Sequence, residues 1–104
     1  MYKPDKYCTK DANIEAMLIT GFPPHDIDIF MWMEQHVGYF NARSGEVPVK
    51  GVSVDENGLM LIATPEGVIQ GKPGDWVVRD DLGNFYTCKK ETFVNRYSRV
   101  ETNE

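Results

Sequence analysis

Three things are scarce in this sequence: cysteine, basic charge and long apolar runs. The 104 residues include two cysteines, Cys8 and Cys88, too few for a disulfide framework. Lysine and arginine number 11 against 16 aspartate and glutamate residues, which gives a formal net charge of -5 at pH 7. This balance argues against a nucleic-acid binder, because neutralising many phosphates requires a basic surplus. No apolar run approaches the roughly 20 residues of a membrane span, so we expect no membrane-spanning segment.

The residue patterns of catalysis and metal binding are also missing. His25 and His36 are about 11 residues apart, which separates them by about 16 Å along one helix and prevents them from sharing a metal ion. Gly71-Lys72-Pro73-Gly74 lacks the Gly-Lys-Ser/Thr pattern of a phosphate-binding loop. Asp75 and the pair Asp80-Asp81 lie at turns, where carboxylates commonly accept backbone hydrogen bonds. We therefore predict no enzymatic activity, no metal ion and no cofactor.

The size and composition predict a single folded domain over residues 1–104. Hydrophobic residues make up 41% of the chain and aromatic residues 12%, enough apolar material to offset the entropy lost on folding. The polar ends, residues 1–10 and 101–104, show no pattern, so we expect them to be loosely ordered. The first residues are charged and polar, without the apolar stretch of a secretory signal, which predicts a cytoplasmic protein with reduced thiols.

The first half of the chain predicts one strand and one long helix. Residues 14–20 are rich in β-branched and apolar side chains and end at Gly21, just before two prolines, which indicates a strand followed by a turn. From about residue 26 to 37, apolar residues recur at three- and four-residue spacing, with acidic residues in the first turn and Gly38 after the last. Within residues 38–51, the segments 39–42 and 47–49 could each be a short extended piece, but Ser44-Gly45 and Pro48 interrupt the pattern, so the sequence leaves the structure of this stretch open.

The middle of the chain predicts a meander of short strands. Residues 52–54 and 59–64 lie on either side of Asn57-Gly58, a dipeptide that favours a two-residue hairpin turn. A second turn follows at 64–67, where proline and glycine occupy the second and fourth positions. The chain then returns through the apolar residues 68–70, so three consecutive strands are expected.

The last third predicts a strand, a turn, a second strand and a short helix. Residues 76–78 place Trp76 and Val78 on one face of a strand, residues 80–83 reverse the chain, and residues 85–88 return antiparallel. Residues 91–97 fit a two-turn helix. The predicted fold is therefore α+β, with a mostly antiparallel sheet of about five strands, a long helix at about 26–37 and a short helix at about 91–97.

These last elements carry motifs in a recognisable order: a Pro-Gly-Asp-aromatic strand entry, a glycine-containing turn, a Phe-Tyr strand and a short helix ending near tyrosine. In this order the chain resembles small bacteriophage and prophage accessory proteins of the PGDYG-like type. Upstream, Ile14-Glu15-Ala16 and Thr64-Pro65-Glu66-Gly67 are similar to the first strand and a turn of that family. The matching residues of the last third are Pro73, Gly74, Asp75, Trp76, Val77, Val78, Gly83, Phe85, Tyr86, Cys88, Lys89, Phe93 and Tyr97.

The resemblance spans about residues 13–100, with two departures: Thr87 and Lys90 stand where prolines are common in the family. It implies a phage accessory protein that acts in the host cytoplasm. The family has no established biochemical activity, so the resemblance implies no catalytic residues.

Two surfaces are candidates for binding. The first is a basic and aromatic surface of the last third, where arginine can pair with phosphate or carboxylate and aromatic rings can stack. Its members are Trp76, Tyr86, Lys89, Lys90, Arg96, Tyr97 and Arg99. The alternative interpretation is an ordinary charged helix whose aromatic residues belong to the core. The second candidate is the apolar face of the long helix with Met31, Trp32 and Met33, which is either core or a surface for a partner or a second copy of the chain.

These observations favour a non-enzymatic bacteriophage accessory protein that binds a host protein stoichiometrically, as an inhibitor in host takeover or anti-defence. The second hypothesis is a sponge that sequesters a small anionic, nucleotide-type signal. The third is a minor structural or morphogenetic phage protein. The sequence leaves both monomer and homodimer open, and it does not identify the partner or ligand.

Overall fold

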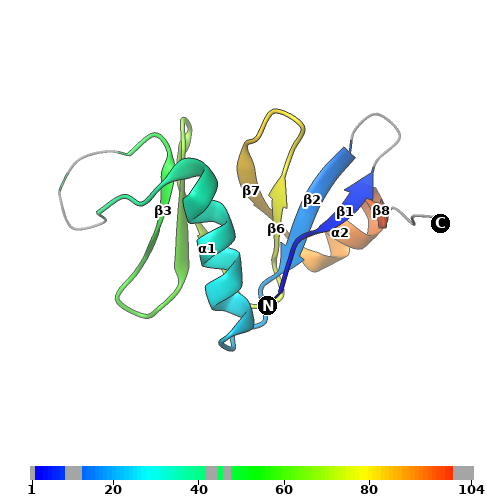
Figure 1. Cartoon of the computed structure of the whole chain (residues 1–104), viewed down its shortest axis with the longest axis horizontal. Coiled ribbons are helices and arrows are strands. Elements are labelled where there is room, and N and C mark those ends of the chain that lie inside the picture. Colours follow the sequence, from blue (N-terminus) through cyan, green and yellow to red (C-terminus); the bar gives the residue numbers. More distant parts are fainter. Residues whose placement is uncertain (1, 9–12, 42–44, 46–47, 100–104) are drawn as a thin grey trace.

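The computed structural model describes residues 2–8, 13–41, 45 and 48–99. Within these ranges the chain forms eight strands and two helices (Figure 1). In chain order they are β1 (Asp5–Cys8), β2 (Asn13–Leu18), α1 (His25–Val37), β3 (Gly51–Val54), β4 (Met60–Thr64), β5 (Gly67–Gly71), β6 (Trp76–Arg79), β7 (Phe85–Cys88), α2 (Lys90–Arg96) and β8 (Ser98–Arg99). Neither helix in the described part of the chain is long and apolar enough to cross a membrane.

The strands form two antiparallel sheets. The larger sheet has the order β7-β6-β2-β1-β8, and the smaller has the order β3-β4-β5. The α+β class, the long helix at about 26–37, the short helix at about 91–97, the meander and the C-terminal hairpin are confirmed. The sequence predicted one sheet of about five strands. The described residues instead form eight strands in two sheets, so the predicted number of strands and the predicted number of sheets were both too low.

Strand β1 accounts for part of that difference. It lies inside residues 1–10, for which the sequence predicted loose order, and it pairs with β2 from Asp5↔Ala16 to Cys8↔Asn13 and with β8 through Tyr7↔Arg99. Its polar composition gave no strand pattern, and the strand is held by pairing on both edges, with the next strand β2 and with the distant β8. Residues 101–104, also predicted to be loose, lie outside the described residues.

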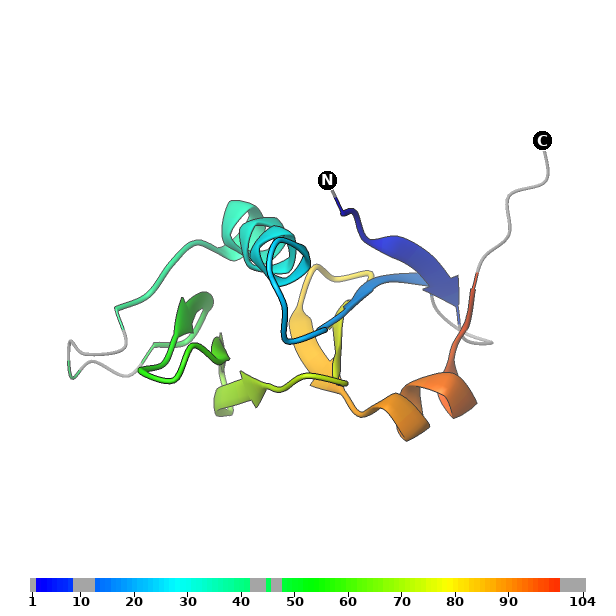
Figure 2. The same ribbon diagram turned by 90° about the horizontal axis from the view of Figure 1, so that it is seen from below.

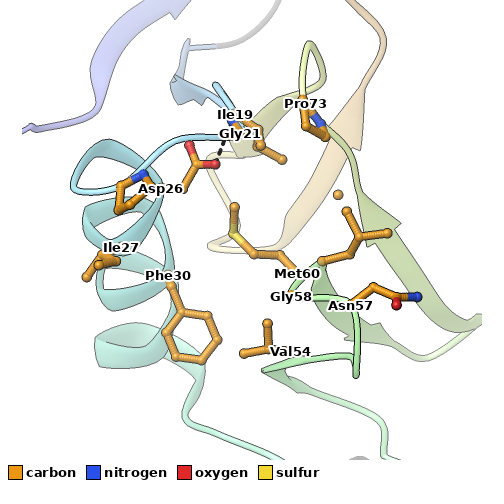
Figure 3. Close-up of a pocket in the computed structure, with 13 residues that line it drawn as sticks. Ile19, Gly21, Asp26, Ile27, Phe30, Val54, Asn57, Gly58, Met60 and Pro73 are labelled. Atoms are coloured by element: carbon orange, nitrogen blue, oxygen red, sulfur yellow. Dashed lines mark hydrogen bonds between the residues drawn. The ribbon is translucent and has the colours of Figure 1, made fainter.

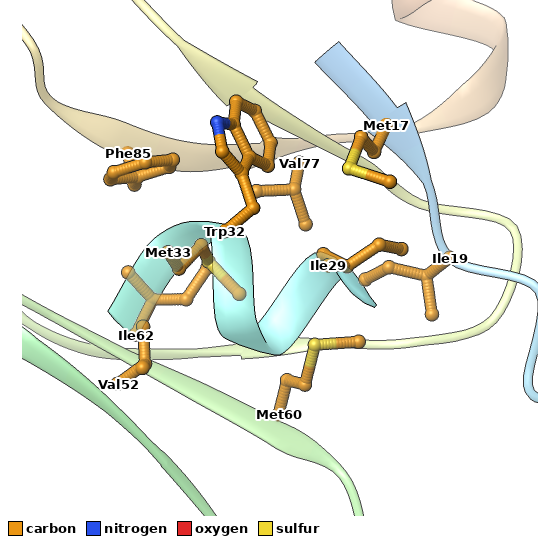
Figure 4. Close-up of a cluster of buried hydrophobic side chains, with 10 residues drawn as sticks. All are labelled: Met17, Ile19, Ile29, Trp32, Met33, Val52, Met60, Ile62, Val77 and Phe85. Carbon is orange, nitrogen blue, oxygen red and sulfur yellow. The ribbon is translucent and has the colours of Figure 1, made fainter. Parts of the chain in front are cut away.

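Helix α1 lies between the two sheets. Figure 4 shows Ile29, Trp32 and Met33 of the helix packed between side chains of the smaller sheet and side chains of the larger sheet. We call this cluster the α1 core; its other members are Met17, Ile19, Val52, Met60, Ile62, Val77 and Phe85. The wide apolar face that the sequence predicts for this helix is therefore buried against two sheets rather than one.

The larger sheet is covered on both faces. Val77 belongs to the α1 core, whereas its neighbour Val78 belongs to a second cluster built around Phe93 of α2, and both valines are fully buried. Successive residues of a strand point to opposite faces, so β6 connects the two clusters. We call the second cluster the α2 core; its buried members are Ile14, Ala16, Val78 and Phe93. In the turned view, α1 and α2 lie on opposite sides of the larger sheet (Figure 2).

Candidate functional site

An apolar groove opens between the first half of α1 and the loop that joins β3 to β4 (Figure 3). It has a volume of about 540 Å³, within the roughly 300–1,000 Å³ range of ligand pockets. The floor is formed by buried side chains of the α1 core and the walls by more exposed residues. The side chains used below are Ile19 and Met60 of the floor, Ile27 and Phe30 of α1, and Val54 and Leu59 of the opposite wall.

Two glycines let the backbone come close enough to shape this groove. Gly21 has a φ of +86°, and a Cβ built there would lie 3.1 Å from Cγ of Pro73. Gly71 is tighter, because a Cβ there would lie 2.7 Å from Cδ1 of Ile19. A side chain at either position would therefore require a neighbour to move, and at Gly71 the residue displaced would be part of the groove floor.

Among the described residues that line the groove, Asp26 is the one with an ionisable side chain, and its carboxylate holds the backbone in place. Its Oδ1 accepts hydrogen bonds from the backbone N–H and the hydroxyl of Thr20, both at 2.9 Å. Its Oδ2 accepts the N–H of Gly21 at 2.7 Å, the bond drawn in Figure 3. The carboxylate thus joins the end of β2 to the first turn of α1. The groove offers apolar contact rather than acid–base chemistry.

The opposite wall is held by the loop of residues 55–59. Oδ1 of Asp55 accepts the N–H groups of Asn57 and Leu59, each at 2.8 Å, and the N–H of Asp55 bonds the carbonyl of Leu59. The sequence predicted a two-residue turn at Asn57-Gly58, but strand pairing begins at Val54↔Met60 and leaves five residues in the loop. The carboxylate of Asp55 stabilises this longer loop, because it accepts hydrogen bonds from two backbone amides within the loop.

Apolar side chains are unusually exposed around the mouth of the groove. Ile27 is 54% exposed and Val54 is 44% exposed, and they stand on opposite walls. Phe22, which lies between the lining residues Gly21 and Pro23, is 72% exposed. A hollow whose apolar floor is bordered by exposed apolar side chains is typical of a surface that another molecule covers.

No family model, curated protein or solved structure matches this chain. The resemblance to bacteriophage accessory proteins therefore stays a prediction. The groove and the two surfaces predicted from the sequence are the features from which a function can be argued.

The aromatic members of the predicted basic and aromatic surface pack into the α2 core. Trp76 stacks on Phe93 with ring centroids 4.1 Å apart and an interplanar angle of 7°, and Tyr7 meets the tryptophan edge-on at 5.5 Å. The hydroxyl groups of Tyr86 and Tyr97 are 3.1 Å apart. Burial and this hydrogen bond both raise the pKa of Tyr86 well above its ordinary value. The aromatic rings therefore pack against and hydrogen-bond to one another, and they do not form an open surface on which a ligand ring could stack.

The cationic members of the same surface are turned outward. Lys89, Lys90 and Arg96 are exposed at the two ends of α2, whereas Trp76 and the two tyrosines are half-buried. Arg99 lies in β8, and its side chain is outside the described residues. The structure thus brings the aromatic residues together and leaves the described cations at the surface, with Arg96 near enough to Tyr86 to act on its hydroxyl electrostatically.

The three residues predicted as a partner-binding helix face do not share one environment. Trp32 and Met33 are buried in the α1 core, with exposed fractions of 6% and 0%, whereas Met31 is 57% exposed. Consecutive residues of a helix are about 100° apart, so three in a row cannot occupy one narrow face. Met31 and Trp32 border a second, more polar hollow of about 740 Å³, whose lining also includes Arg79 and Glu15, cross-strand neighbours that form an ion pair at 3.3 Å.

The groove residues were missed by sequence reasoning because they come from separate segments. Gly21 and the two prolines marked a turn, and the loop at 55–59 was recognised as a reversal, but nothing in either segment shows that they face each other. The one local signal was the width of the apolar face of α1, which exceeds what a single sheet can cover and leaves Ile27 at the surface.

Proposed function

We propose that this chain is a non-enzymatic binding protein that holds one partner protein in the apolar groove. The observation that carries the proposal is that two exposed apolar residues, Ile27 of α1 and Val54 of β3, line the same hollow as the buried Ile19 and Met60. Binding energy in protein interfaces is concentrated in a few apolar anchors that enter such hollows and exclude water. Among the described lining residues, the one carboxylate, that of Asp26, is occupied by the N–H groups of Thr20 and Gly21 and by the Thr20 hydroxyl, which supports binding rather than acid–base chemistry in the groove.

The setting that we propose is a bacteriophage accessory protein that binds a host protein stoichiometrically, as an inhibitor in host takeover or anti-defence. The order of motifs in the last third and the acidic balance of the chain support this setting. The sponge hypothesis has weaker support, because a nucleotide would need an aromatic face and that of Trp76 is stacked on Phe93. No observation favours a structural phage protein over these.

Capture from a bacterial lysate tests the docking function. The test variant is Ile27→Gln on the groove wall, and the matched control is Val94→Gln on α2, a side chain that is 61% exposed and lies outside the groove lining. We expect the wild-type chain and the control to retain one stoichiometric protein, and the groove variant to retain about tenfold less, since an amide buried at the interface lacks partners. Equal melting temperatures of the two variants would show that both are folded.

Two outcomes would contradict the proposal. One is that the wild-type chain retains no stoichiometric protein. The other is that Ile27→Gln and Val94→Gln reduce capture equally, because the partner would then lie elsewhere on the surface.

A further inference from the structure

Strand β5 forms an open edge of the smaller sheet. Among the described strands its one pairing partner is β4, so its other side faces outward. The opposite edge of this sheet is closed, because the N–H of Val52 in β3 bonds the carbonyl of Gly38 and the carbonyl of Val52 accepts the N–H of Phe40. Strand β5 also has no charged side chain, no proline and no bulge, the features by which edge strands commonly avoid pairing with another chain.

The hydrogen bonds of the neighbouring strands determine which backbone groups of β5 face outward. Val52 bonds residues 38 and 40, and the N–H of Asp55 bonds the carbonyl of Leu59, so the odd-numbered residues of β3 bond the odd-numbered residues of β4. Bonding alternates along an antiparallel strand, so the even-numbered residues of β4 bond residues 67, 69 and 71 of β5. The N–H and C=O groups of Val68 and Gln70 therefore point away from β4, and both residues are exposed.

A second copy of β5 in antiparallel orientation matches this edge. In the register centred on Ile69, the outward groups of Val68 meet those of Gln70 of the second copy, and Ile69 lies opposite Ile69. The flanking residues then match in charge, because the exposed Glu66 lies opposite the exposed Lys72 of the second copy, and symmetry repeats this pair. A shift of two residues in either direction keeps outward groups aligned but loses both ion pairs.

From this match we infer that β5 pairs antiparallel with β5 of a second copy of the chain and joins the two smaller sheets, of three strands each, into one continuous sheet. Val68 and Gln70 supply the backbone hydrogen bonds at the centre of the interface. The exposed pairs of Glu66 and Lys72 add little affinity, but they select this register. The interface is small, so we expect a weak dimer with micromolar affinity. The inference goes beyond docking in the groove, because neither Val68 nor Gln70 lines it.

Sedimentation velocity over a micromolar concentration series tests the inference. We expect the wild-type chain to shift from monomer to dimer as its concentration rises. Lys72→Glu should weaken the dimer about tenfold, because it turns two ion pairs into two contacts between like charges. The matched control is Lys50→Glu, which changes the net charge equally at an exposed residue just before β3, on the other side of the sheet, and should have a much smaller effect.

Two further variants separate pairing in this register from general charge effects. Glu66→Lys combined with Lys72→Glu reverses both members of each ion pair, so the double variant should recover the affinity that Lys72→Glu loses. Gln70→Pro removes an N–H that faces away from β4, so it should abolish the dimer and leave the pairing with β4 in place. A cooperative melting curve by circular dichroism would show that this variant is folded.

Four results would overturn the inference. They are a wild-type chain that stays monomeric throughout the series, equal effects of Lys72→Glu and Lys50→Glu, a double variant that remains as weak as Lys72→Glu alone, and a folded Gln70→Pro variant that still dimerises. The charge variants keep the test decisive if the proline variant does not fold.

Discussion

At the scale of single residues, the carboxylate of Asp26 is the group that connects β2 to α1 beside the groove. One carboxylate accepts three hydrogen bonds, two from Thr20 and one from Gly21, and so determines how the chain leaves β2 and enters α1. Hydrogen bonds to a charged acceptor contribute more than neutral ones, and the donors here lose their partner together if the carboxylate is removed. The groove wall that carries Ile27 depends on this connection.

Asp26→Ala should therefore lower the free energy of unfolding by about 2–3 kcal/mol. Urea denaturation measures the change. The control is Asp81→Ala, which removes an exposed carboxylate from the β6–β7 turn and should change stability by no more than about 0.5 kcal/mol. If the two substitutions cost the same, the carboxylate of Asp26 contributes only its charge and does not hold the backbone.

At the scale of elements, α2 depends on one side chain. The helix has seven residues, too few to be stable alone in water, and Phe93 is the buried residue that attaches it to the larger sheet. Phe93 is 2% exposed, stacks on Trp76, and also contacts Tyr7 and Tyr97 within 5.0 Å between ring centroids. Packing against distant strands, not helix propensity, stabilises this element.

Phe93→Ala should cost about 3–5 kcal/mol, the range for truncating a buried aromatic side chain. Val94→Ala is the matched control, because the neighbouring side chain is exposed and its removal should cost no more than about 0.5 kcal/mol. Chemical denaturation gives both values. A small loss for Phe93→Ala would indicate that α2 contributes little to the fold.

The elements also show how far the sequence could predict this structure. The helix at 26–37, the meander and the C-terminal hairpin follow from local periodicity and turn residues, which were readable. Strand β1 has no local signal, because its polar residues form a strand only through their pairing with β2 and β8. The groove could not be predicted without knowing that α1 faces the 55–59 loop. The burial of both Trp32 and Met33 could not be predicted without knowing that a second sheet packs against the helix. The local sequence pattern does not show which segments far apart in the chain pack or pair with each other, and this information was needed for the rest of the fold.

At the scale of the whole molecule, the two cores share β6. Val77 enters the α1 core and Val78 the α2 core, so loss of this strand exposes both clusters at once. The chain has two tryptophans, and each reports on one cluster: Trp32 belongs to the α1 core, and Trp76 packs against the α2 core. We infer that the chain unfolds as one cooperative unit, as small domains commonly do.

Two variants with a single tryptophan test this expectation. In Trp76→Phe the fluorescence reports on the α1 core, and in Trp32→Phe it reports on the α2 core. In each variant, we expect the fluorescence midpoint in urea to coincide with the midpoint measured by circular dichroism. A fluorescence midpoint that precedes the circular dichroism midpoint in either variant would show that one cluster opens before the other.

The molecule is elongated, with extents of 47 × 28 × 25 Å, and the β3–β4 end lies far along the long axis from α2 and β8 (Figure 1). A tag or tether attached beyond β8 would therefore lie at the other end of the long axis from the β3–β4 loop, which forms one wall of the groove. Surface-immobilised capture could use that end without obstructing the mouth of the hollow, whereas crosslinking through Lys72, which adjoins the groove lining, would compete with the occupant.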